Sequence, residues 1–349
     1  MNASQIMITG PRRSELVPFE IPDQDLGPSE IIVRTKATLL SSGTEGAGFQ
    51  GQGLPGRAPR AYPRQTGYAN VGEVIAVGGP EAGVTVGDVV YTMSPHASHI
   101  RLDTALRPCI KVPGSVAPEE ATFVRLATVP FTSIRTSFAR AGDRAAAVGL
   151  GLIGNLGAQL LREAGMSVTG VDLVASRREL AGRCGIETTI DPREEGAVRP
   201  EHRLVLEASG TARGTMTAVA MAQVGGEVSL VGTPWVPDPS VLASPMLEAI
   251  HLRFVTIRSG WEWQIPTLEP GTVPDGRVVG PGGPLADSIH VPGSTVHSSH
   301  YVFDLLRRGR LNVRELITHR YAPSDCQYAY EGAVDRKDEQ LGVIFNWDN

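Results

Sequence analysis

The feature that most constrains the fold of this chain is a glycine pattern, AVGLGLIG, at residues 147–154. It reads Gly-x-Gly-x-x-Gly and stands between an apolar run typical of a β-strand and a segment typical of a helix. In such a junction Gly149 permits a tight turn, Gly151 lets the backbone approach a pyrophosphate, and Gly154 lets the helix pack closely on the strand. The helix amino terminus also presents unpaired N–H groups to phosphate. The loop residues assigned to a dinucleotide are Gly149, Gly151, Leu152, Ile153 and Gly154.

A carboxylate closes the next expected strand. Asp172 lies 18 residues after Gly154, where it would hydrogen-bond an adenosine ribose. The same charge repels the additional phosphate of NADP, so the sequence favours NAD as the cofactor. Arg177 could instead pair with such a phosphate, or it could be a solvated residue in the first turn of the helix. A glycine-rich junction that binds no ligand is the alternative to this prediction.

From about residue 121 onward, segments typical of strands and helices alternate. Such alternation predicts parallel βαβ units, and six strands complete a doubly wound nucleotide-binding domain. The strands are expected at 145–148, 168–172, 187–190, 203–208, 227–231 and 253–257, and the helices near 152–165, 175–183, 211–223 and 243–249. Ser209, Val231 and Thr233, at the ends of two of these strands, are also assigned to the cofactor.

The two ends of the chain have a different texture. Residues 1–120 predict an all-β domain, since short β-prone runs at 31–34, 73–77 and 88–91 alternate with Gly/Pro-rich turns. The Gly/Pro/Arg-rich stretch 43–64 is expected to be mostly loop, and loops of that length are usually functional. The expected fold class is therefore α/β, with an all-β domain at 1–120 and a doubly wound domain at 121–260. Residues 261–349 are expected to insert a loop and return to the first domain.

Composition excludes several classes of function. The net charge of −5 gives no electrostatic reason for binding nucleic acid or an anionic membrane surface. No apolar run has the length of a signal peptide or a membrane span. Cys109, Cys184 and Cys326 lie far apart, which argues against a disulfide framework and a four-cysteine zinc site. A cytoplasmic protein with a small-molecule substrate is expected.

The sequence resembles the medium-chain dehydrogenase/reductase family, whose best-known members are zinc-type alcohol dehydrogenases. The segments that carry the resemblance are 67–74, 86–90, the phosphate loop and 316–321, so it spans nearly the whole chain. The resemblance implies a GroES-like catalytic domain, a Rossmann cofactor domain, and a homodimer formed by edge-to-edge pairing of the two cofactor sheets.

The zinc ligands of the family have no counterpart in this sequence. The three corresponding segments read Ser42-Gly43-Thr44-Glu45, Gly67-Tyr68-Ala69 and Val124-Arg125-Leu126-Ala127-Thr128. Serine, tyrosine and valine cannot form a zinc site, because zinc binds thiolate, imidazole or carboxylate donors. The resemblance therefore points to a branch without the metal, similar to the group that includes bacteriochlorophyllide a dehydrogenase, and no metal site is expected.

Without a metal, hydrogen-bond donors or a general base must handle the substrate oxygen and its proton. Tyr68, at the position of a zinc ligand, could donate a hydrogen bond to that oxygen, or its ring could merely fill the vacated cavity. His96 could be a general base, or a loop histidine bonded to the backbone. Ser42 and Thr44 could relay a proton, although Ser42 could equally be an inert replacement for the cysteine.

Further residues are assigned to the substrate and the nicotinamide. The resemblance places Thr128 on the nicotinamide side. Glu45 could orient the substrate site or pair with an arginine. Trp261, Glu262 and Trp263 could form a wall that stacks on a ring and binds hydroxyl groups, or they could form a core or dimer contact.

Together these features predict a metal-independent, NAD-linked dehydrogenase that interconverts a secondary alcohol and a ketone. The long polar stretches 43–64 and 261–295 suggest a bulky or polyhydroxylated substrate such as a sugar, a cyclitol or a natural-product ring. Two alternatives remain open. One is a zinc-free enoyl or quinone reductase that uses NAD(P)H, and the other is a non-catalytic sensor that binds the dinucleotide.

Overall fold

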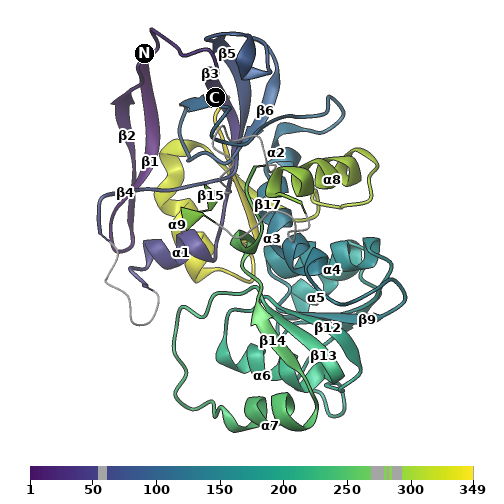
Figure 1. The fold of residues 1–349 in the computed structure, drawn as a ribbon. Helices are drawn as coiled ribbons and strands as arrows, with labels where there is room; N and C mark the ends of the chain where they lie inside the picture. The colour runs from purple at the N-terminus through teal and green to yellow at the C-terminus, as the bar shows by residue number, and fades with distance from the viewer. Residues whose placement is uncertain (54–60, 269–278, 281–282, 285–292, 349) are drawn as a thin grey trace.

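The chain forms two large sheets, one above the other in Figure 1. The structure is a computed structural model that describes residues 1–53, 61–268, 279–280, 283–284 and 293–348. Among these residues, no helix combines the length and the apolar character needed to cross a bilayer.

The lower sheet has six parallel strands in the order β11-β10-β9-β12-β13-β14. This order confirms the doubly wound sheet predicted from the alternating pattern. The strands are β9 (Arg144–Val148), β10 (Ser167–Val171), β11 (Thr188–Ile190), β12 (His202–Glu207), β13 (Ala222–Leu230) and β14 (Thr256–Ser259). The helices that connect them are α4 (Leu152–Glu163), α5 (Ala175–Arg183), α6 (Ala212–Met221) and α7 (Ser244–Leu252).

Both faces of this sheet are buried, because neighbouring side chains along a strand point to opposite faces. Ala145 of β9 packs in one apolar cluster with Leu156 and Leu160 of α4. Ala146, the next residue, packs in another cluster with Ala218 of α6. The small apolar side chains that follow one another in β9 are therefore those expected in a central strand that helices cover on both faces.

The upper sheet joins the two ends of the chain. Its order is β17-β18-β3-β5-β6-β8, and β7 also pairs with β3. These strands are β3 (Glu30–Leu40), β5 (Asn70–Val77), β6 (Val89–Thr92), β7 (His99–Asp103), β8 (Cys109–Lys111), β17 (Ile317–Tyr321) and β18 (Gly342–Asn346). β18 runs antiparallel to β3, with Val343 opposite Leu40, so the carboxyl-terminal segment does return to the first sheet.

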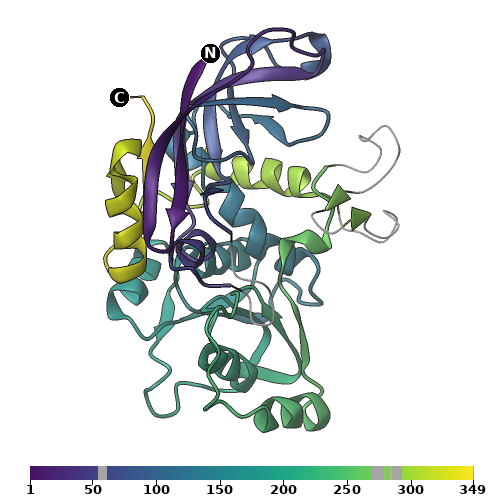
Figure 2. The ribbon, with the colours of Figure 1, turned by 90° about the vertical axis from the view of Figure 1, so that its left-hand side faces the viewer.

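A smaller sheet and a helix cover one side of this arrangement. β1 (Asn2–Gly10) pairs with β2 (Arg13–Glu20) and with β4 (Arg64–Gln65). Helix α9 (Cys326–Asp335) lies beside the β1–β2 hairpin in both views (Figures 1 and 2). The remaining short elements are η1 (Pro80–Ala82), η2 (Glu262–Gln264), η4 (Pro323–Asp325), and the paired strands β15 (Val279–Gly280) and β16 (Gly283–Pro284).

The stretch 43–64 is less irregular than its composition predicts, because it contains helix α1 (Thr44–Phe49). Short helices of glycine-rich sequence are unstable alone and depend on tertiary packing. Here the packing is tight: a Cβ atom on Gly46 would lie 3.0 Å from the Val334 side chain of α9. Gly46, one of the glycines that predicted a loop, thus allows α1 to approach α9 closely. Residues 54–60 lie outside the described part of the stretch.

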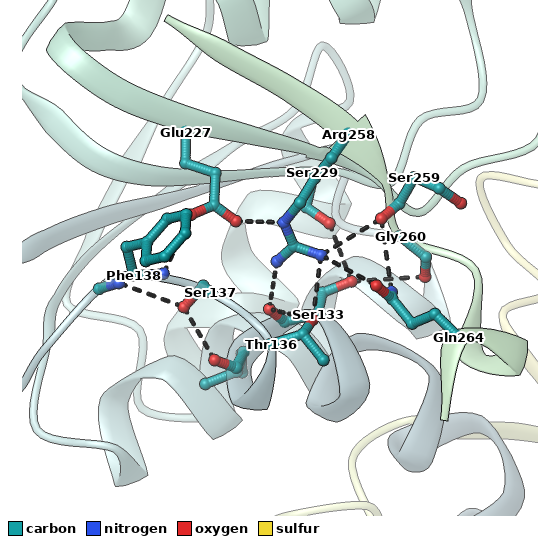
Figure 3. Close-up of polar contacts among 12 residues, drawn as sticks. Ser133, Thr136, Ser137, Phe138, Glu227, Ser229, Arg258, Ser259, Gly260 and Gln264 are labelled. Atoms are coloured by element: carbon teal, nitrogen blue, oxygen red, sulfur yellow. Dashed lines mark hydrogen bonds and ion pairs between the residues drawn. The ribbon is translucent and has the colours of Figure 1, made fainter. Parts of the chain in front are cut away.

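Three more helices lie between the sheets: α2 (Pro118–Ala121), α3 (Val124–Arg135) and α8 (Thr295–Arg307). A polar network ties α3 to the parallel sheet (Figure 3). Arg258 of β14 pairs with Glu227 of β13, and it donates hydrogen bonds to Thr136 Oγ1 at 3.0 Å and to the Ser133 carbonyl at 2.6 Å. Ser133 Oγ in turn contacts the Gly260 carbonyl at 3.4 Å. The segment after β14 is therefore held against α3.

Candidate active site

The phosphate loop leaves an open cradle at the start of α4. Gly149 has a φ of +86°, and a Cβ there would lie 2.6 Å from the Ser209 amide nitrogen. A Cβ on Gly154 would lie 1.7 Å from the Gly149 carbonyl oxygen. A Cβ on Gly151 would meet no atom within 4 Å, and no side chain caps the helix there. The free N–H groups and the open space fit the pyrophosphate of a dinucleotide.

Asp172 follows β10 beside this loop and is buried. One carboxylate oxygen accepts a hydrogen bond from the Leu150 amide at 2.7 Å, and the other accepts one from the Val174 amide at 2.9 Å. Arg177 lies 3.6 Å from Asp172 and also donates to the Lys337 carbonyl at 2.9 Å. A carboxylate offers about four acceptor positions, so Asp172 retains capacity for ribose hydroxyls.

The other residues assigned to the cofactor lie at the carboxyl ends of β12 and β13, where doubly wound sheets bind their ligands. Ser209 is exposed and lies against Gly149. The Val231 amide donates to the Glu207 carbonyl at 2.8 Å, and Thr233 lies against Gly210. Thr128 is different: it is buried in α3, and its hydroxyl donates to the Arg125 carbonyl at 2.9 Å. That hydroxyl is therefore already engaged within its own helix.

Tyr68 lies in a small cleft of about 80 Å³ between α1 and the turn before β5. The cleft is also lined by Thr44, Glu45, Thr66 and Gly67. The side chains of Ser41 and Thr44 lie close enough to the phenol to lower its pKa, against the larger effect of burial. Of the two hydroxyls predicted to relay a proton, Ser42 and Thr44, the structure brings Thr44 close to Tyr68. Ser41, the neighbour of the predicted Ser42, was not foreseen by the sequence analysis.

The electrostatics of the cleft keep the Tyr68 phenol protonated. Burial and the negative charge of Glu45 raise the pKa of Tyr68 to about 12, although Arg125 acts in the opposite direction. At neutral pH the group is a hydrogen-bond donor rather than a base. This protonation state suits the donor role predicted for Tyr68.

His96 and Glu45 belong to a buried polar network behind the cleft. His96 Nε2 lies 3.0 Å from Glu45 Oε2, and the same carboxylate oxygen accepts hydrogen bonds from Thr66 at 2.5 Å and Tyr330 at 2.6 Å. The other Glu45 oxygen accepts one from the Ser41 amide at 2.9 Å. His96 is fully buried, and its Nδ1 has no hydrogen-bond partner in the described parts of the chain. His96 therefore reaches the cleft only through its neighbours, whereas Glu45 lines the cleft directly.

The sequence analysis missed Arg125, the charged residue that contacts Tyr68. Its Cζ atom lies 5.0 Å from the centre of the Tyr68 ring, and its Nη2 pairs with Glu262 at 2.6 Å. Val124, which the sequence analysis placed at the third ligand position, is instead buried in the apolar core. A single charge within the otherwise apolar run 123–127 is the signal that could have identified Arg125.

The tryptophan segment contributes unequally to the site. Glu262 is buried in its ion pair with Arg125. Trp263 is half-buried, with its ring centre 5.8 Å from Arg125 Cζ, whereas the Trp261 side chain is 57% exposed. The structure thus brings Glu262 and Trp263 to the site and leaves Trp261 on the surface. Residues 269–278, 281–282 and 285–292 of the predicted substrate stretch lie outside the described part.

The residues at this site do not fit a catalytic zinc ion. No group of three or more His, Cys, Asp or Glu side chains with metal-binding geometry occurs in the part of the chain that the structure describes. The guanidinium of Arg125 stands beside Tyr68 instead, and its positive charge would repel a divalent cation. No step of the chemistry is therefore derived through zinc.

Comparison with known proteins agrees with this fold. Residues 153–268 match the family model for zinc-binding dehydrogenases. The D-guloside 3-dehydrogenase of Shigella flexneri is 26% identical over 277 residues, covering 71% of this chain and 76% of that protein. The L-threonine 3-dehydrogenase of Caldanaerobacter subterraneus is 25% identical over 262 residues, covering 63% and 73%. The solved structure of an oxidoreductase/dehydrogenase of unknown specificity from Escherichia coli matches with a TM-score of 0.77 at 18% identity, covering 99% of both chains.

The glycine cradle, the two sheets and these relatives define the class of protein. It is an oxidoreductase of the alcohol dehydrogenase kind, built from a GroES-like part and a Rossmann part. More narrowly, the chain is similar in sequence and fold to proteins of the medium-chain dehydrogenase/reductase family.

Proposed function

We propose that this protein is a metal-independent, NAD-linked dehydrogenase that interconverts a secondary alcohol and a ketone. One observation carries the proposal: a protonated phenol, Tyr68, and a buried guanidinium, Arg125, meet where the family motifs would place zinc ligands. Such a pair can polarise a substrate oxygen without a metal, since preorganised donors stabilise the charge that develops on it.

The residues of the cleft account for the proton. In the direction of reduction, the Tyr68 hydroxyl donates a hydrogen bond to the substrate carbonyl and then transfers its proton to the alkoxide oxygen. The bound nicotinamide supplies the hydride in this direction and accepts it in the other. Thr44 is exposed and its side chain lies near the phenol, so in this proposal it links Tyr68 to solvent and lets the proton be replaced. Alcohol oxidation follows the same path in reverse.

Asp172 supports NAD as the cofactor. Its carboxylate is fixed by two backbone amides beside the phosphate loop, where it accepts hydrogen bonds from a free ribose and disfavours a phosphate. Gly149, Gly151 and Gly154 hold the pyrophosphate at the start of α4 in this proposal.

The D-guloside relative supports a polyhydroxylated substrate. The D-guloside 3-dehydrogenase is named for a sugar derivative, and the L-threonine 3-dehydrogenase for a hydroxylated amino acid. Both names specify dehydrogenation at carbon 3. We extend this to a ring with several hydroxyl groups, with Trp263 and Glu262 near the reacting carbon.

The homodimer forms part of the proposal. Strand β14 is the edge of the parallel sheet, and α7 exposes apolar side chains at Leu247, Ile250 and Leu252. Pairing of two β14 edges would satisfy the unpaired backbone groups of the sheet. Light scattering of the purified protein should give twice the chain mass of 37.1 kDa.

NADH formation by the purified protein tests this function. The panel contains sugars, cyclitols and larger ring alcohols, each with NAD or NADP and with or without a strong chelator. Turnover with NAD that resists the chelator is the expected result. Loss of activity with chelator would contradict metal independence, and a strong preference for NADPH with enoyl or quinone substrates would favour the reductase alternative. NADH binding without turnover on any substrate would favour the sensor.

A further inference from the structure

We propose that the guanidinium of Arg125 binds the substrate oxygen during hydride transfer and takes the role that zinc has in the metal-dependent members of the family. The inference deepens the proposed function and rests on it. It assigns to a residue of α3 the stabilisation of the developing negative charge, while Tyr68 supplies the proton.

Arg125 has donors that the described part of the protein does not use. Its side chain is 5% exposed, and among the described residues its hydrogen-bond partner is Glu262, 2.6 Å from Nη2. Nε and Nη1 are buried and have no hydrogen-bond partner among the described residues. Buried donors without partners are costly, and native structures rarely keep them without a reason. Two unused N–H groups on a buried cation therefore indicate a ligand oxygen.

The position of these donors connects them to the cleft. The guanidinium covers the ring of Tyr68, which lines the cleft, and it also lies over Trp263. The Tyr91 hydroxyl is also buried and has no hydrogen-bond partner in the described structure. Burial raises the pKa of Tyr91, and the nearby positive charge of Arg125 opposes this rise. In this proposal, a carbonyl oxygen that accepts a hydrogen bond from Tyr68 also accepts one from Arg125, whose guanidinium lies against the same ring.

The charge balance decides which kind of oxygen fits. Glu262 neutralises Arg125, so the buried pair has no net charge. A permanent carboxylate would leave a net negative charge in this buried place, which is unfavourable. A ketone oxygen enters neutral and becomes negative only as the hydride arrives, so the interaction with Arg125 strengthens towards the transition state. The site therefore favours a carbonyl or alkoxide oxygen over an anionic substrate group.

The surrounding structure fixes the pair in place. Glu262 follows β14, and Arg258 of that strand is bound to Ser133 of α3, the helix that carries Arg125, and to Thr136 just after that helix (Figure 3). The two partners thus belong to segments that are tied together by other contacts. Glu262 is a positioning residue in this scheme, because it acts on the substrate only through Arg125.

The step balances without any further reactant. The carbonyl carbon gains the hydride with its two electrons, and the π electrons of the C=O bond move to the oxygen. Tyr68 then transfers a proton to that oxygen. Arg125 gives up no proton, since a guanidinium stays charged in proteins.

The test compares three variants with the wild type. The double substitution Arg125→Met with Glu262→Gln removes both charges, and thus avoids leaving a buried carboxylate unpaired. It should lower kcat for the alcohol about 10²–10³-fold and leave the dissociation constant of NADH within about threefold of the wild-type value. Glu262→Gln keeps the guanidinium and should lose less activity. Arg135→Met changes an arginine of the same helix that hydrogen-bonds Ser298 at 2.9 Å, and it should behave like the wild type.

A binding measurement covers the case in which no substrate is found. Cyclohexanecarboxamide offers a carbonyl oxygen that cannot accept a hydride, and its binding to the protein–NADH complex is followed by NADH fluorescence. We expect binding to the wild type and to Arg135→Met, and at least tenfold weaker binding to the double variant. Unchanged kcat in the double variant, equal amide binding, or no amide binding to the wild type would each overturn the role of Arg125.

The two measurements separate this inference from the proposed function. Amide binding that depends on Arg125, without turnover of any alcohol, would contradict the dehydrogenase and support the oxygen site. Turnover that does not depend on Arg125 would do the reverse. Should the double variant fail to fold, Arg125→Lys keeps the charge but loses the planar fork, and kcat should fall about tenfold. An unchanged kcat in Arg125→Lys would then overturn the role.

Discussion

Alanine at Gly154 should mainly lower stability, whereas alanine at Gly151 should mainly weaken cofactor binding. The two glycines are three residues apart in one loop, and the same methyl group is added in both cases. At Gly154 the new Cβ would lie 1.7 Å from the Gly149 carbonyl oxygen, whereas real Cβ atoms essentially never come under 3.0 Å from such an atom. At Gly151 it would meet nothing within 4 Å.

The magnitudes follow from these contacts. Gly154→Ala must push the helix from the strand by roughly 1.3 Å, and overpacking of this kind costs about 1–3 kcal/mol or more. Helix propensity returns up to about 1 kcal/mol, so a net loss of about 1–2 kcal/mol in the free energy of unfolding is expected. Gly151→Ala, with φ at −64°, is open to alanine and should cost under about 1 kcal/mol. Its methyl group would instead occupy the space of the pyrophosphate and weaken NADH binding at least tenfold.

Urea unfolding and NADH fluorescence titration measure the two quantities on the same samples. The wild type and Gly182→Ala, a helix glycine whose Cβ would also meet nothing within 4 Å, are the controls. If Gly151→Ala binds NADH as tightly as the wild type does, the dinucleotide does not lie in the cradle, and the reasoning fails. If Gly154→Ala is as stable as Gly182→Ala, the packing argument for Gly154 is wrong.

Three further changes test the site. Tyr68→Phe should lower kcat about 10²–10⁴-fold with NADH affinity unchanged. Since the pKa of Tyr68 is raised to about 12, steady-state profiles of ketone reduction in the wild type should show no loss of the Tyr68 acid between pH 6 and about 10. Glu45→Gln should reduce the free energy of unfolding by about 1–3 kcal/mol at pH 7, measured in urea. Burial works to raise the pKa of Glu45, but His96 and the other hydrogen-bond donors lower it on balance, so its contribution to stability exists above about pH 4.5 and disappears as the pH falls through the folded pKa. The wild type should therefore lose more stability in acid than Glu45→Gln does, and parallel curves would contradict this. Asp172→Asn should raise kcat/KM for NADP relative to NAD about tenfold, and an unchanged ratio would remove the case for Asp172 as the selector.

Local signals in the sequence were sufficient for the cofactor part of the fold. The six parallel strands and the position of Asp172 beside the glycine loop were predicted, because a buried parallel strand is a short apolar run and its phosphate turn requires glycine. The same rules failed at α1, where glycines serve close packing against α9 instead of a loop.

The candidate catalytic site was only partly predictable. Tyr68 and Thr44 could be named from their motif positions, and the structure brings them together. Arg125 could not be paired with Glu262 from sequence, since the two residues are 137 positions apart and no periodicity links them. The protonation state of Tyr68 was equally hidden, because it depends on burial and on the nearby charge of Glu45.

The sequence by itself determined the βαβ architecture, the phosphate loop and the absence of zinc donors at the three motif positions, since each of these depends on neighbours within a few residues. Only the tertiary structure decided what stands beside Tyr68 and which donors remain unused. That information arises when β14 and its following turn pack against α3, which places Glu262 on Arg125 and leaves Nε and Nη1 without partners in the described structure. Contacts between distant segments depend on three-dimensional packing, and burial then sets how strongly each charge acts.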